Sequence, residues 1–263
     1  MQDAAEMALA SVADGTPVDG MATFATLGAD GRHPQNAERD LHRWLRNLHG
    51  TNIEAYPVSI KLQTKAEVDP IDVVVPVILP SDMLYHLHRH DQWEASVVGQ
   101  TGDDGLREFW TNAATQPWGR NHPATKLPDL GKTVPIYWHC DGAEFRTNAE
   151  LMVWSWSSAM TRGDTMRTKF LFAAIPAEFF PSKALKRLVH KELTKVIAWS
   201  CEALLAGRFH LKGFYGEPFT GWRRSMAGRV IAHLYRAAYC GWKGDWKARR
   251  EAHFFKQHYN ATF

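Results

Sequence analysis

The fold is decided by the stretch VPIYWHCDGAEFRTNAELMVWSWSSAM, residues 134–160. Its first residues, through Trp138, form an apolar and β-prone run without a helical period, which predicts a buried strand. We expect that strand to end at Asp141-Gly142, where the glycine leaves room for a ligand beside the carboxylate. A hairpin turn at the same Asp-Gly pair is the alternative.

The residues after this stretch continue an α/β pattern. Ser182 can cap a long helix with one apolar and one basic face, and Gly207 can end it. Residues 230–242 are ambiguous between a strand and a helix, and they lead to a second Gly-Asp pair, Gly244-Asp245. We expect strands at 151–156 and 169–175 and helices at 183–206 and 248–255.

The residues before this stretch predict a different organisation. We expect a weakly ordered N-terminus at 1–35, a mainly helical region at 36–116 and a proline-containing linker at 117–133 that precedes the domain at 134–263. Within the helical region, residues 53–62 can form an edge strand, because Pro57 excludes a central one. The histidines of HLHRH, residues 86–90, alternate along an expected helix and point around it, so we expect a surface or interface face and not a metal site.

Composition excludes several classes of protein. The chain has 263 residues, of which 45% are hydrophobic, and this is enough for a substantial core. No apolar run approaches the ~20 residues of a membrane span. The 3 cysteines lack the spacing of a disulfide framework or a zinc site, and the motifs of serine hydrolases, P-loop proteins and zincins do not occur. We therefore expect an intracellular protein with reduced thiols.

Charge is distributed unevenly along the chain. Residues 183–263 hold 16 Lys and Arg against 5 Asp and Glu, whereas residues 1–182 hold 15 against 23. A basic third beside an acidic remainder indicates a surface for a polyanion such as DNA, although a solvated helix face gives the same pattern. The candidate nucleic-acid-binding residues are Lys183, Lys186, Arg187, Lys191, Trp222, Arg223, Arg224, Lys243, Lys247, Arg249 and Arg250.

Asp141 and Asp245 are the candidate catalytic and metal-binding residues. The order of strand with terminal acid, two strands, helix, and core segment with terminal acid matches the first part of an RNase H-like fold. Two carboxylates held side by side can bridge two divalent ions about 3.5–4 Å apart, which cleave or join phosphodiesters. Hard oxygen ligands favour Mg²⁺ or Mn²⁺.

Four runs carry a resemblance to a known family: IYWHCDGAEF from 136, MVWSWSS from 152, KFLFAAIP from 169 and YRAAYCGWKGDWKARREAHFFKQHYNATF from 235. Residues 130–263 resemble transposases of the CACTA (En/Spm) kind. The resemblance implies an RNase H-like fold, a mobile-element origin, a DNA partner, and Asp141 and Asp245 as the first two acids of a catalytic triad. The third acid, normally a glutamate on a later helix, has no counterpart in the 18 residues after Asp245. This departure implies a truncated chain that is inactive alone.

The leading prediction is thus an α/β protein with an incomplete RNase H-like mixed sheet and flanking helices, derived from a transposase. The alternatives are a non-catalytic nucleic-acid-binding module and an interaction protein whose basic face binds an acidic partner. A DNA partner is compatible with a nuclear location. The relative position of Asp141 and Asp245 distinguishes the leading prediction from the other two.

Overall fold

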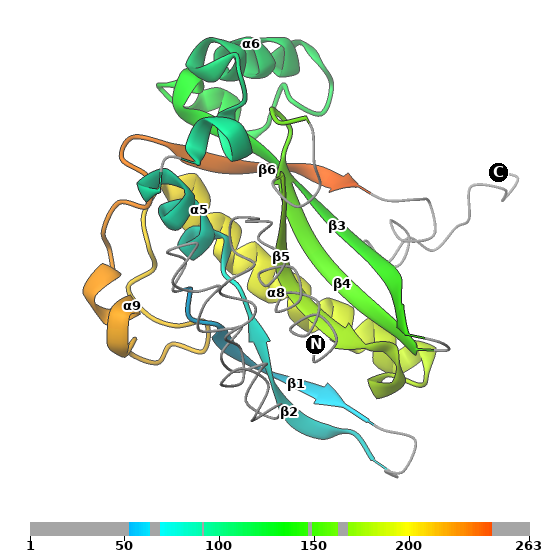
Figure 1. Cartoon of the computed structure of the whole chain (residues 1–263). Helices are drawn as coiled ribbons and strands as arrows, with labels where there is room; N and C mark the ends of the chain where they lie inside the picture. The colour runs from blue at the N-terminus through cyan, green and yellow to red at the C-terminus, as the bar shows by residue number, and fades with distance from the viewer. Residues whose placement is uncertain (1–52, 64–68, 91, 147–148, 163–167, 244–263) are drawn as a thin grey trace, which may run out of the picture. The chain divides into compact units, whose positions relative to one another are not determined.

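A four-stranded mixed sheet with the strand order β5-β4-β3-β6 forms the centre of the structure (Figure 1). The computed structural model describes residues 53–63, 69–90, 92–146, 149–162 and 168–243, all within one unit that begins at Ile53. The predictions for 1–35, for Asp245 and for the helix at 248–255 lie outside these residues.

The strands of this sheet are mostly those that the sequence predicts. β3 (Thr133–Arg146), β4 (Ala149–Ser158) and β5 (Lys169–Pro176) are antiparallel neighbours. The ambiguous segment at 230–242 ends in a strand, β6 (Arg236–Lys243), which is parallel to β3. The chain is therefore a mixed α/β protein, and the strands predicted at 151–156 and 169–175 are confirmed.

β3 buries one of its two faces. Val134, Ile136 and Trp138 are fully buried, whereas Tyr137 and His139, on either side of Trp138, are half-buried. Because successive side chains of a strand point to opposite faces, the first three belong to the core and the other two to the opposite face. The ring of Trp138 packs edge to face against Phe172 of β5, with 5.1 Å between the ring centroids.

The predicted end of this strand at Asp141-Gly142 is wrong. Asp141 pairs with Val153 and Gly142 pairs with Met152, and the pairing with β4 continues toward Arg146. The Asp-Gly pair is therefore neither the end of the strand nor a hairpin turn. The local turn preference of this pair is overridden because β4 supplies backbone partners beyond it.

The long helix α8 (Lys183–Ala206) connects β5 to β6 and packs along the sheet (Figure 1). The Ser182 hydroxyl accepts a hydrogen bond from the Leu185 N–H at 3.1 Å, which caps the N-terminus. Gly207 ends the helix with a φ of 69°, a left-handed conformation that glycine adopts without strain. Trp154 of β4 contacts His190 of α8 at 5.2 Å between ring centroids. The helix predicted at 183–206 is confirmed.

A second, two-stranded sheet precedes the larger one. β1 (Tyr56–Leu62) and β2 (Ile71–Val77) are antiparallel, and Pro57 pairs with Pro76. Both prolines are tolerated because each strand of a two-stranded sheet has a free edge. The described residues of the region expected to be mainly helical therefore begin with a hairpin, and the helices α5 (Pro80–Arg89), η1 (Glu94–Val98) and α6 (Gly102–Thr115) follow it.

The segment 117–133, which the sequence predicts to be a linker, lies inside the unit that begins at Ile53. It contains two short 3-10 helices, η2 (Pro123–Lys126) and η3 (Leu130–Lys132). The fully buried Trp110 of α6 donates its indole N–H to the Thr133 carbonyl at 2.6 Å, which fixes α6 at the start of β3. None of the helices among the described residues has the length and apolarity that crossing a membrane requires.

Candidate functional site

Asp141 lies on the face of the sheet that points away from the core, which we call the open face. His139, two residues earlier on β3, pairs with Ser155 of β4 and with Lys243 of β6. Tyr137 belongs to the same face, and the Lys243 ammonium lies 4.8 Å from the centroid of its ring. The register thus brings side chains of three strands together on the open face, at levels two to four positions before the exposed carboxylate of Asp141.

The open face carries positive charge near this carboxylate. Burial lowers the pKa of Lys243, and the nearby charge of Lys169 on β5 lowers it further. Both lysines are exposed, so the two edges of the sheet each contribute one cation to the open face. The register places Lys169 at the level of Tyr137 and Lys243 at the level of His139, so both cations lie two to four positions before Asp141 along β3. A phosphate group on this part of the open face would meet these cations before it reached the carboxylate, which repels it.

The second predicted acid, Asp245, lies outside the described residues. Lys243, the last described residue of β6, pairs with His139, two positions before Asp141 on the parallel strand. The described part of β6 therefore ends two positions before the level of Asp141, whereas β3 continues past that level to Arg146. The position of Asp245 relative to Asp141 stays a prediction.

The fit of a divalent metal ion to the described residues is incomplete. The Asp141 carboxylate is an exposed hard-oxygen ligand, and one of its oxygens accepts a hydrogen bond from the Gly142 N–H at 2.9 Å. The Glu150 carboxylate of β4 lies over Gly142, where an added Cβ would be 1.8 Å from its Oε1, and so belongs to the opposite face. No group of three or more His, Cys, Asp and Glu with metal-binding spacing exists within the described ranges.

The basic residues of α8 form a stripe on its surface. Lys183, Arg187, Lys191 and Lys195 are all exposed and follow one another at every fourth position. Lys195 is paired with Glu192 at 2.8 Å, whereas Lys186 is half-buried beside the stripe. Because Lys195 is paired with Glu192, we restrict the name α8 stripe to Lys183, Arg187 and Lys191.

The other predicted nucleic-acid-binding residues have diverse positions. Arg223, in the short helix α9 (Gly221–Met226), is buried, and its guanidinium binds the buried carboxylate of Asp82 at 2.8 Å. Trp222 is half-buried, with its ring against Tyr85 and Phe209. Arg224 and Lys243 are exposed. Lys247, Arg249 and Arg250 lie outside the described residues.

The histidine run of α5 contributes mainly to packing. His86 is only 9% exposed, and its ring stacks on His90 at 6.0 Å and contacts Trp222 at 5.8 Å. His88 packs between Trp93 and Tyr235. Of the expected surface or interface face, the surface part does not describe His86, because residues 86 and 90 share a helix face that turns toward α9.

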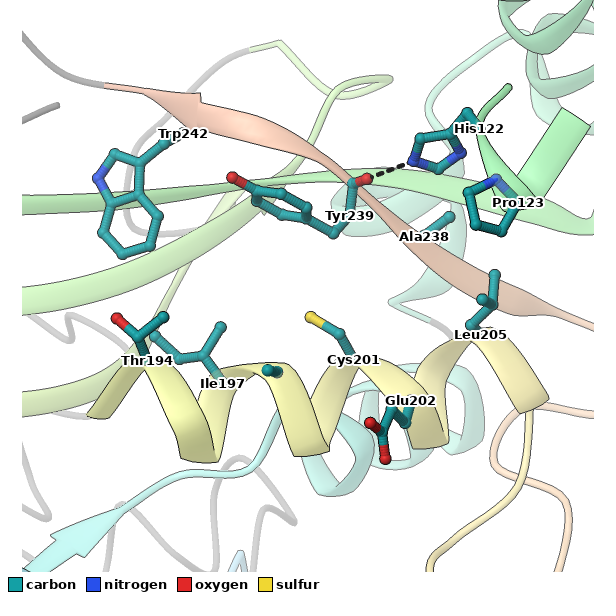
Figure 2. A pocket seen from close by; sticks show the side chains of 11 residues that line it. His122, Pro123, Thr194, Ile197, Cys201, Glu202, Leu205, Ala238, Tyr239 and Trp242 are labelled. Atoms are coloured by element: carbon teal, nitrogen blue, oxygen red, sulfur yellow. Dashed lines mark hydrogen bonds between the residues drawn. The ribbon is translucent and has the colours of Figure 1, made fainter. Parts of the chain in front are cut away.

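A cavity of about 500 Å³ opens between α8 and β6 (Figure 2). Ile197, Cys201 and Leu205 of α8 face Tyr239 and Trp242 of β6 across it, and His122 lies at one end. The sequence gives no signal for this cavity, because its lining comes from three segments whose proximity follows only from the fold. Small residues at Ala198 and Ala238 help to leave the space open.

Comparison with known proteins finds no family model, no curated protein and no solved structure that matches this chain.

Proposed function

We propose that this chain contains part of an RNase H-like domain related to DNA transposases, with Asp141 as one ligand of a divalent metal site. The observation that carries the proposal is the strand order β5-β4-β3-β6 with the connections that produce it. Three antiparallel strands are followed by the helix α8, and α8 leads to a strand parallel to the first. This is the order of the first part of an RNase H-like fold.

The register of the parallel pair supports the position of the site. Asp141 is exposed on β3, and the described chain leaves β6 two positions before its level. We propose Asp245 as the second ligand and Mg²⁺ or Mn²⁺ as the ion. When bound, such ions activate a water or a 3′-hydroxyl and stabilise the leaving oxygen of a phosphodiester. Lys243 and Lys169 would hold the phosphate backbone on the open face by charge.

We propose further that the chain binds metal and DNA without cleaving DNA by itself. The described residues place no third acidic ligand beside Asp141, and two-metal catalysis requires both ions to be held in a fixed geometry.

Metal binding is the first test of this proposal. Mn²⁺ should be titrated into the native chain, with binding measured by calorimetry and by water proton relaxation. We expect the native chain to bind Mn²⁺ and the variants Asp141→Asn and Asp245→Asn to lose this binding. Asp72→Asn is the matched control, because Asp72 is also an exposed strand aspartate but lies on β2. Equal Mn²⁺ binding by the native chain and by Asp141→Asn would contradict the metal site. Cleavage or strand transfer by the native chain with Mg²⁺, lost in Asp141→Asn, would instead contradict the proposed inactivity.

The α8 stripe favours a second candidate function, a non-catalytic nucleic-acid-binding module. Its three cations are exposed and repeat once per helical turn, so they can contact one phosphate backbone together. DNA binding that neither chelators nor Asp141→Asn alter would favour this function over the metal site.

The contribution of the stripe is measurable from the salt dependence of DNA binding. Replacing Lys183, Arg187 and Lys191 with Gln should reduce the slope of log K against log salt by up to about 2.7, or about 0.9 per lost phosphate contact. The matched control replaces three exposed cations outside the stripe with Gln, namely Lys61, Arg120 and Lys126. Equal slopes for the two triple variants would show that binding does not use the stripe.

A further inference from the structure

The cavity between α8 and β6 has the size and shape of a small-molecule site. Its volume of about 500 Å³ lies within the range of about 300–1,000 Å³ that ligand pockets occupy. Ile197, Cys201 and Leu205 recur at every fourth position of α8 and form one wall, and Tyr239 and Trp242 form the other (Figure 2). It lies on the α8 side of the sheet, away from Asp141, so it is independent of the proposed metal site.

Two polar side chains of the lining already have hydrogen-bond partners. The Nδ1 of His122 accepts from the Ala124 N–H at 3.1 Å. Its Nε2 therefore carries the proton and donates to the Tyr239 carbonyl at 2.8 Å. The Thr194 hydroxyl donates to the His190 carbonyl at 2.7 Å. These bonds leave little capacity for a strongly polar ligand.

Among the other polar groups of the lining that the structure describes, Glu202 carries a charge, whereas Cys201 and Tyr239 do not. Burial raises the pKa of the Cys201 thiol to about 11 and the pKa of the Tyr239 phenol to about 12, so both are protonated at neutral pH. Glu202 is exposed, and its carboxylate points away from Tyr239 and Trp242 (Figure 2). An anion in this cavity would lose its hydration without gaining a cationic partner from the lining residues that the structure describes.

We infer that this cavity binds a small, uncharged and mainly apolar molecule with at least one aromatic ring. An apolar cavity stabilises ordered water poorly, but it binds apolar molecules that fill it. The rings of Tyr239 and Trp242 offer flat surfaces for an aromatic ligand, and the Tyr239 hydroxyl can donate to one acceptor on it. A nucleic acid or a phosphorylated metabolite does not fit, because no cation lies within the cavity wall formed by the described residues.

The test uses two fluorescent probes that differ by one charge, N-phenyl-1-naphthylamine and 8-anilinonaphthalene-1-sulfonate. The uncharged amine should bind the full chain saturably, with one site and quenching of tryptophan fluorescence. The sulfonate, which has the same ring skeleton, should bind at least about tenfold more weakly, a difference of 1.4 kcal/mol. Equal affinity for the two probes would overturn the inferred ligand class, and no saturable binding of the amine would overturn the site.

A matched pair of variants locates the binding. Ala198→Phe places a ring in the cavity, where Ala198 contributes to the lining, and should weaken binding of the amine at least about tenfold. Ala184→Phe introduces the same ring at an exposed position of α8 outside the lining and should leave the affinity within about twofold. Both positions are exposed, so both variants should fold, and thermal unfolding checks this. Unchanged binding in Ala198→Phe would show that the probe binds elsewhere.

Discussion

Replacing Arg223 with Met tests how much the buried ion pair between Arg223 of α9 and Asp82 of α5 stabilises the fold. Its Nε and Nη2 donate to the same oxygen of Asp82 at 3.1 and 2.8 Å, and Nη2 also donates to the Glu54 carbonyl. Asp82 is only 1% exposed, and its other oxygen accepts from the Ser81 hydroxyl at 3.1 Å. The variant would therefore leave a buried carboxylate with one remaining partner.

The structure sets the size of the expected loss. Two hydrogen bonds to a charged group contribute about 1.5–3 kcal/mol each, and removal of one member of a buried pair costs about 3–5 kcal/mol. We therefore expect Arg223→Met to lower the free energy of unfolding by about 4 kcal/mol. For a unit of this size, the melting temperature should fall by roughly 10 °C.

Urea denaturation monitored by tryptophan fluorescence measures this loss, and an exposed pair provides the control. Lys61 and Asp72 lie 3.1 Å apart but are more than half exposed, so Lys61→Met should cost less than about 1 kcal/mol. The double variant Asp82→Leu with Arg223→Met should recover much of the loss, because no unpaired charge remains buried. Equal losses in Arg223→Met and Lys61→Met would refute the reasoning.

The pH dependence of the same variant gives a second check. Burial raises the pKa of Asp82 even with Arg223 present, and removal of the guanidinium should raise it further. A carboxyl whose pKa is higher in the folded state stabilises the fold below its unfolded pKa, and this contribution is lost as the pH rises through the folded pKa. The destabilisation of Arg223→Met should therefore be smaller in acid than at neutral pH.

Two further predictions concern backbone conformation and acid stability. Gly99 has a φ of 71°, and an added Cβ would lie 2.5 Å from the Met160 carbonyl oxygen, so Gly99→Ala should destabilise by more than about 3 kcal/mol in thermal unfolding. Gly216→Ala, with a φ of 86° and open space, should cost only about 1–2 kcal/mol, and equal costs would contradict this reading. Burial, and secondarily the charges of His90 and Arg89, lower the pKa of His86. The unfolded state therefore binds more protons below about pH 6.5, and stability should fall as the pH falls from 7 to 5. His86→Leu should reduce this slope, and an unchanged slope would count against the assignment.

Three of the four strands of the larger sheet, β3, β4 and β5, could be predicted because their burial follows the sequence, whereas the segment that contains β6 was ambiguous between a strand and a helix. Trp154 and Trp156 of β4 are buried on one face, and Phe170 and Phe172 of β5 are buried as their counterparts. Local pattern failed at Asp141-Gly142, where turn-forming residues occur inside a strand. The strand continues there because β4 provides partners, and a single-sequence pattern does not contain that information.

The burial of individual arginines and histidines could not be predicted from the local sequence. Arg223 and Arg224 are adjacent in a Trp-Arg-Arg motif, yet only Arg223 is buried. Its partner Asp82 is 141 positions away in the chain, so the distinction arises only from the tertiary structure. For the histidine run, the spacing of two positions suggested divergence, whereas the spacing of four between His86 and His90 determined the packing.

A bulge in β6 allows one short strand to serve both proposed sites. Tyr239 and Trp242 are three positions apart, so in a regular strand they would point to opposite faces. The register shifts between them, because Tyr239 pairs with Ile136 while Gly241 already pairs with Tyr137. The extra residue, Cys240, changes the alternation, so that both aromatic rings line the cavity beside α8. Lys243 then falls on the open face, where it reaches the ring of Tyr137. The apolar cavity and the charged surface beside Asp141 therefore depend on the same single-residue insertion.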